Sequence, residues 1–209
     1  MGHSHSHPHS SSKHGKAFGI GITLNAIYVA VELFYGFAVD STALIADAGH
    51  NASDVLSLIL AWAAIWVAAK RPSGKYTYGL RKTTNMASLV NGILIIGAAV
   101  LIAWDAIRKF QNPVEIQGDI VMIVAAIGLV VNTGTAFLFY KDQKSDLNIR
   151  GAFLHMAADA GVTLGVLLGG LAIKYTGVTW IDPLLGLIIV VVIVHSAWGL
   201  LTDSVKLAL

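Results

Sequence analysis

The sequence predicts an all-α membrane protein that crosses the bilayer six times. Of its 209 residues, 56% are hydrophobic and 12% are charged, whereas soluble domains carry about 25% charged residues. Apolar runs of more than about 18 residues follow one another along the chain, which is typical of membrane-spanning helices. The chain has no cysteine, so a metal bound by it needs nitrogen and oxygen ligands.

Six apolar segments predict the spans. Each is long enough to cross a hydrocarbon layer of about 30 Å at about 1.5 Å per helical residue. The segments are 17–38, 42–69, 83–107, 117–140, 149–173 and 179–202.

Each break between these segments holds turn residues or charge. Asp40-Ser41 ends the first segment, and the basic stretch 70–75 ends the second. The third ends at Gln111-Asn112-Pro113, the fourth at 141–144, and the fifth at Lys174 with Gly177. Such residues favour turns and lie outside the hydrocarbon layer, so short connections between antiparallel helices are expected.

The distribution of basic residues predicts the orientation. With six spans, 11 of the 14 Lys and Arg residues fall on the side of the two termini. The positive-inside rule therefore places both termini in the cytoplasm. Residues 1–16 are polar and are expected to form a flexible cytoplasmic tail, followed by a six-helix transmembrane domain over 17–209.

The pattern His-x-x-x-Asp occurs twice inside apolar segments, as His50/Asp54 and His155/Asp159. A spacing of four residues puts both side chains of a pair on one helix face. Burial of imidazole and carboxylate in hydrocarbon costs several kcal/mol, so such groups mark an ion pathway, a proton relay or a buried ion pair. The pairs are the strongest functional signal in the sequence.

Counting residues from each expected helix end places both pairs close to the bilayer midplane, at about 1.5 Å per residue. The predicted second and fifth helices are antiparallel, so the pairs can converge on one point. Two nitrogens and two oxygens suit a tetrahedral divalent ion such as zinc. The alternative is a purely structural role, in which each pair only joins helices through a buried polar contact.

Other polar residues in the apolar segments are candidates for a supporting role. Asp47 lies one turn before His50, where it could orient the imidazole or line the cation entry path. Asn25 and Glu32 in the first segment and Asn132 in the fourth could line the pathway or hydrogen-bond between helices.

The N-terminal tail is rich in histidine, which indicates loose metal capture at the cytoplasmic face. An expression tag is the alternative interpretation, although Ser and Pro interrupt the histidines, which favours a native tract. The candidate residues are His3, His5, His7 and His9.

Several motifs, in order, resemble the cation diffusion facilitator family, and most closely its bacterial zinc-transporting members. They are STALIADAGHNASD in the second segment, RPSGKYTYGLRK after it, NIRGAFLHMAADA at the fifth and WIDPLLGLII at the sixth. The resemblance implies export of zinc in exchange for protons, a homodimer with alternating access, and a location in the inner (plasma) membrane. The family's metal ligands fall on His50, Asp54, His155 and Asp159.

The resemblance has two further implications. Lys82 and Asp203 are placed like an inter-helix charge pair of some relatives, at the inner ends of the third and sixth helices. Family members usually continue into a cytoplasmic metal-binding domain, whereas this sequence ends at Leu209. The chain is therefore expected to be a truncated or a minimal member.

Two other classes compete with zinc transport. Cadmium, cobalt, nickel or iron(II) fit the same ligand types, because affinity follows the metal series. A non-transporting membrane sensor would use the pairs for metal binding or packing alone. An enzyme is not expected, because four protein ligands leave no open position for an activated water, and the sequence contains no HExxH motif.

Overall fold

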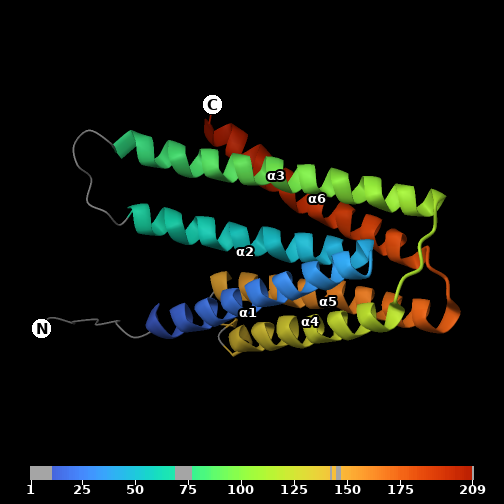
Figure 1. The fold of residues 1–209 in the computed structure, drawn as a ribbon. Coiled ribbons are helices and arrows are strands. Elements are labelled where there is room, and N and C mark those ends of the chain that lie inside the picture. Colours follow the sequence, from blue (N-terminus) through green and yellow to red (C-terminus); the bar gives the residue numbers. More distant parts are fainter. Residues whose placement is uncertain (1–10, 69–76, 142, 145–146, 209) are drawn as a thin grey trace, which may run out of the picture.

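The described part of the chain is an all-helical bundle (Figure 1). This computed structural model describes the backbone of residues 11–68, 77–141, 143–144 and 147–208, and the side chains of 19–56, 59, 89–141, 143–144, 149–199 and 201–202. The helices are α1 (Ser11–Ala38), α2 (Thr42–Ala68), α3 (Thr77–Gln111), α4 (Gly118–Phe139), α5 (Leu147–Thr176) and α6 (Ile181–Ala208).

The predicted fold class of a polytopic helical membrane protein is confirmed. Described stretches of 19 to 28 residues in α1, α3, α4, α5 and α6 are long and apolar enough to cross a membrane. In α2 the side chains are described without a gap only over 42–56, which is shorter than a span. Large apolar side chains such as Phe37, Leu101 and Val130 are about 70% exposed, which lipid tolerates and water penalises.

The first and third helices begin before the apolar segments that predict them. The first helix begins at Ser11 and the third at Thr77, six residues before the predicted segments in both cases. Residues 11–16 are thus helical, although the sequence assigns them to a flexible tail. Once an apolar helix has formed, adding a polar residue costs little, because each added residue gains one backbone hydrogen bond.

Two helix pairs, the central helix α2 and the helix α1 make up the bundle (Figure 1). The most extensive contacts join α4 to α5 and α3 to α6, and α2 lies between the pairs, in contact with α1, α3 and α6. The contact between α2 and α5 is much smaller. The two helices that carry the His-x-x-x-Asp pairs are therefore held mainly by other neighbours.

The helix connections alternate between two ends of the bundle. The turns after α1, α3 and α5 lie at one end, while α1 begins and α6 ends towards the other (Figure 1). The turn after α1 contains Asp40, whose φ of 54° is in the left-handed region that Asp tolerates better than most residues. Ser41 then caps α2, because its Oγ accepts a hydrogen bond from the N–H of Leu44 at 3.2 Å.

Glycines allow the closest approach of helices. A Cβ atom on Gly118 would lie 2.7 Å from the carbonyl oxygen of Gly170, and one on Gly170 would lie 2.8 Å from the backbone nitrogen of Met122. Small residues at such crossings let helix backbones pack directly against each other, which stabilises association in lipid. The pair α4–α5 is held in this way.

Gly128 on α4 is a second point where a side chain does not fit. A Cβ atom there would lie 2.0 Å from the hydroxyl oxygen of Tyr28, and this ring is 2% exposed. We expect Gly128→Ala to destabilise the protein by about 1–3 kcal/mol, the usual cost of overpacking. Thermal unfolding in detergent measures this loss. Gly134→Ala on the same helix meets nothing within 4 Å and should change stability by less than about 0.5 kcal/mol; an equal loss in both variants would contradict the steric explanation.

Candidate metal centre

The structure brings together the four side chains of the two His-x-x-x-Asp pairs. His50 Nε2 lies 3.9 Å from Asp54 Oδ2 on its own helix and 3.4 Å from Asp159 Oδ1 on α5. His155 Nε2 lies 3.4 Å from Asp54 Oδ2 on α2 and 3.7 Å from Asp159 Oδ2 on its own helix. Each imidazole thus faces both carboxylates, and the helical spacing of four residues produces the same arrangement on both helices.

The spacing of these atoms matches the ligand shell of one ion. Ligands bound about 2.1 Å from a tetrahedral zinc ion lie about 3.4 Å from one another. The four nitrogen–oxygen distances span 3.4 to 3.9 Å, and ligand atoms of His50, Asp54 and Asp159 all lie within 4.8 Å of each other. His155 is outside this group of three, so a shell of four ligands needs its side chain to approach the other three.

The site is buried on one side and open on the other. The side chains of His50 and Asp159 are each 8% exposed, that of Asp54 is 24% exposed, and that of His155 is 47% exposed. Asp54 Oδ2, which faces both imidazoles, is buried without a hydrogen-bond partner among the described residues. A buried anionic oxygen without a donor is costly, and a bound cation would satisfy it.

Asp47 is more deeply buried than the four residues. It bonds to Thr163 of α5, which in turn bonds to Asn132 of α4. Its Oδ2 accepts a hydrogen bond of 3.0 Å from Thr163 Oγ1, which in turn accepts one of 3.1 Å from Asn132 Nδ2. Asp47 and Thr163 are both 0% exposed. The side chain of Asp47 is therefore not a water-exposed group near the outer mouth, and its role in orienting His50 or along the cation path stays a prediction.

Glu32 of α1 is enclosed in the same region. Its Oε1 accepts a hydrogen bond of 2.8 Å from the Tyr28 hydroxyl, and its Oε2 accepts one of 3.5 Å from Asn51 Nδ2. Its side chain is 0% exposed and within hydrogen-bonding reach of Asp47. Asn25, the other polar residue singled out in α1, is half-buried, and its Oδ1 has no hydrogen-bond partner among the described atoms.

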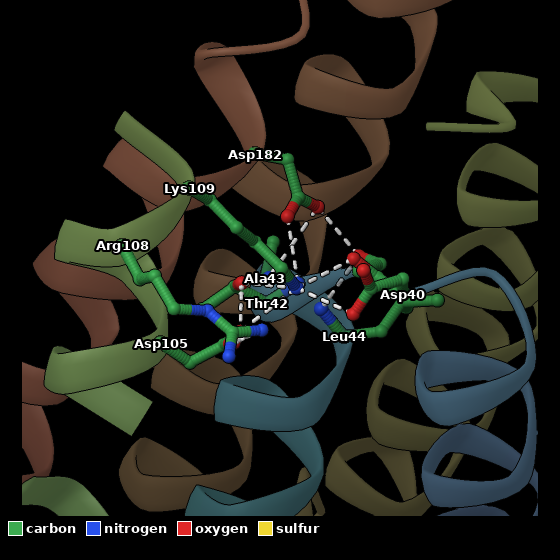
Figure 2. Close-up of polar contacts among 9 residues, drawn as sticks. Asp40, Thr42, Ala43, Leu44, Asp105, Arg108, Lys109 and Asp182 are labelled. Atoms are coloured by element: carbon green, nitrogen blue, oxygen red, sulfur yellow. Dashed lines mark hydrogen bonds and ion pairs between the residues drawn. The ribbon is translucent and has the colours of Figure 1, made fainter. Parts of the chain in front are cut away.

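A second polar cluster, which the sequence analysis missed, ties the turn after α1 to α3. Figure 2 shows Lys109 reaching from α3 towards Asp40 and Thr42. Lys109 Nζ lies 2.8 Å from both Asp40 Oδ1 and Asp105 Oδ2, and it donates to the Asp40 carbonyl at 2.7 Å and to Thr42 Oγ1 at 3.0 Å. Although Lys109 is 2% exposed, its charge is thus fully paired.

Asp182 extends this cluster to α6 (Figure 2). Its carboxylate accepts hydrogen bonds from the Ser41 hydroxyl and from the backbone N–H groups of Thr42, at 2.6 Å, and Ala43, at 3.4 Å. An anion at a helix N-terminus satisfies free N–H groups and interacts favourably with the helix dipole. In the sequence Asp182 is visible only as part of the WIDP motif.

Two sets of predicted residues lie outside the described part of the chain. The side chains of Lys82 and Asp203 are not among those described, so their pairing stays a prediction. The same holds for the histidine tract, whose members are His3, His5, His7 and His9.

The chain matches a known protein family over most of its length. The family model of the cation efflux transmembrane domain matches residues 19–207. The chain belongs to the cation efflux family. Its match covers all the described spans, and the family resemblance inferred from the sequence motifs is confirmed.

Several bacterial proteins are similar to this cation efflux chain. A zinc transporter, ZitB, of Escherichia coli K12 is 34% identical over 212 residues, covering 99% of this chain and 67% of the relative. A cadmium, cobalt and zinc/H(+)-K(+) antiporter of Bacillus subtilis is 32% identical, covering 96% and 65%. The cation efflux system protein CzcD of an Alcaligenes strain is 31% identical, covering 100% and 65%. The chain thus spans about two thirds of the length of these relatives.

Proposed function

We propose that this cation efflux chain exports zinc from the cytoplasm in exchange for protons. One ion binds between α2 and α5, with His50, Asp54, His155 and Asp159 as its four ligands. The observation that carries the proposal is the convergence of two imidazoles and two carboxylates from antiparallel helices at distances of 3.4 to 3.9 Å. The similarity to a zinc transporter and to an antiporter of cadmium, cobalt and zinc supports it.

The ligand chemistry couples the metal to protons. Two carboxylates cancel the charge of a divalent ion in a low-dielectric interior, and imidazole favours zinc over magnesium or calcium. All four groups bind the ion in their deprotonated forms, so protons compete with it for the same atoms. Histidine changes charge near neutral pH, which suits a carrier that exchanges protons for metal.

The small contact between α2 and α5 suits alternating access. Both helices are held mainly by other neighbours, so the ligand pairs can move relative to each other without breaking the main helix contacts. The excess of Lys and Arg on the side of the termini supports an orientation in the inner membrane with both termini in the cytoplasm. We further propose a homodimer, as the family resemblance implies.

Transport of the purified chain in liposomes tests this function. Zinc is expected to accumulate inside vesicles with an acidic lumen when the cytoplasmic face of the protein points outward, and the lumen is expected to lose protons as zinc enters. Accumulation should vanish when the pH gradient is collapsed with an ionophore. Zinc uptake that needs no pH gradient would contradict antiport, and zinc binding without flux would favour a sensor.

The same vesicles identify the metal. One relative is named for cadmium and cobalt as well as zinc, and the four ligands bind such borderline ions as well. Zinc is expected to give the largest ratio of maximal rate to half-saturating concentration when cadmium, cobalt, nickel and iron(II) are compared under one pH gradient. A larger ratio for another ion would change the cargo but not the site.

A further inference from the structure

Glu32 and Asp47 form a pair of buried carboxyl groups separate from the candidate metal ligands. Both side chains are 0% exposed, and each is within hydrogen-bonding reach of the other. Two carboxylates cannot hydrogen-bond unless one of them carries a proton, because an ionised carboxylate only accepts. Two ionised groups at this distance in a low-dielectric interior would also repel each other strongly.

Among the residues that the structure describes, no positively charged group bonds to the pair. Glu32 accepts from the Tyr28 hydroxyl and the Asn51 amide, at 2.8 and 3.5 Å, and Asp47 accepts from the Thr163 hydroxyl at 3.0 Å. All three donors are neutral, and together they stabilise one negative charge rather than two.

The charges of the metal centre act on the pair from further away. His50 of α2 and Asp159 of α5 are the titratable groups of the candidate metal centre that act on Asp47 through space.

One oxygen of the pair is unsatisfied in the absence of a proton. Asp47 Oδ1 is buried and has no hydrogen-bond partner among the described atoms, which is unusual for a polar atom in a packed interior. A proton on either carboxyl group supplies the missing donor. We propose that Glu32 and Asp47 share one exchangeable proton and form a proton-binding site of this chain, distinct from the metal ligands.

The position of the pair links its proton to the candidate metal centre. Asp47 lies three residues from His50 on α2, and its partner Thr163 lies four residues from Asp159 on α5. A displacement between α2 and α5 that changes the distances among the metal ligands therefore also changes the Asp47–Thr163 hydrogen bond. Proton affinity of the pair then depends on metal occupancy, which is a reciprocal coupling between two sites. Only this part rests on the proposed function.

Infrared spectroscopy detects the shared proton without any transport. At a pH where exposed carboxyl groups are ionised, the wild type is expected to show the C=O stretching band of a protonated carboxyl group. The band should disappear in Glu32→Gln and in Asp47→Asn, since each leaves a single carboxylate facing an amide donor. Glu115→Gln is the matched control, because Glu115 is exposed, and it should leave the band unchanged. A wild type without the band, or a band that survives in both variants, would overturn the proposal.

Proton counting in proteoliposomes tests the exchange of this proton. The number of protons moved per zinc ion is expected to fall by one in Glu32→Gln and to stay the same in Glu115→Gln. If the infrared band is lost but the number of protons per zinc ion is unchanged, the proton is bound but not exchanged. That result would overturn the proposed exchange of the proton. If the wild type moves zinc without protons while the infrared result holds, the proton site stands and the proposed antiport fails.

Discussion

Asp159→Ala is expected to abolish metal-dependent transport. Its carboxylate is 8% exposed and lies 3.4 Å from His50 and 3.7 Å from His155, so its removal leaves two imidazoles and one carboxylate for the ion. Loss of a residue that merely supports a ligand costs about 10–100-fold in metal affinity. Loss of a ligand itself should therefore weaken zinc binding by more than about 100-fold.

Replacement of any of the other three proposed ligands by Ala is also expected to abolish transport, but the variants should differ in stability. Removal of His50 leaves the buried Asp159 and the partly exposed Asp54 without that partner, whereas His155 is 47% exposed and water can replace its contacts. His155→Ala should therefore unfold at nearly the wild-type temperature. Titration calorimetry with zinc in detergent measures the affinity, and thermal unfolding measures the stability.

Asp119→Asn provides the matched control for Asp159→Ala. Asp119 is an acidic residue on α4 whose side chain is 62% exposed and lies 3.8 Å from Lys174. Exposed ion pairs contribute at most about 1 kcal/mol, so zinc affinity and transport should remain within about twofold of the wild type. Transport that survives in both Asp159→Ala and His50→Ala would remove the metal centre from its proposed place.

Lys109→Met is expected to cause the largest loss of stability. The lysine is 2% exposed and binds two carboxylates, a carbonyl group and a hydroxyl group at 2.7 to 3.0 Å. Removal of one partner from a buried charge network costs about 3–5 kcal/mol. Since Asp40 and Asp105 are 57% and 30% exposed, water relieves part of this cost, and a value near about 3 kcal/mol is expected.

Arg108→Met is the control for Lys109→Met, because it also removes a positive charge from α3 but at an exposed position. Arg108 is the neighbouring cation, is 66% exposed and lies 3.7 Å from Asp105, so its removal should cost less than about 1 kcal/mol. Chemical or thermal unfolding in detergent measures both variants. The double variant Lys109→Met/Asp105→Asn should recover part of the loss, because it removes one of the two unpaired carboxylates. Equal stability of Lys109→Met and the wild type would show that the cluster does not stabilise the turn after α1.

The sequence predicts a large part of this protein. Membrane spans follow from the length of apolar runs, because only helices satisfy their own backbone hydrogen bonds in lipid. The two His-x-x-x-Asp pairs follow from helical spacing, and matching depths on antiparallel helices predict their convergence. The structure does bring His50, Asp54, His155 and Asp159 to one place. These features depend on local spacing, which a single sequence displays.

Tertiary structure alone decides the partners of isolated polar residues. Thr42 and Asp182 are separated by 140 positions, Asp47 and Thr163 by 116, and Glu32 and Asn51 by 19. Helical periodicity gives the face of one helix but not which neighbour covers it, because that depends on how all six helices pack. The sequence therefore determined the spans and the helical spacing of the two His-x-x-x-Asp pairs, while the packing decided that Lys109 is paired and that Glu32 meets Asp47.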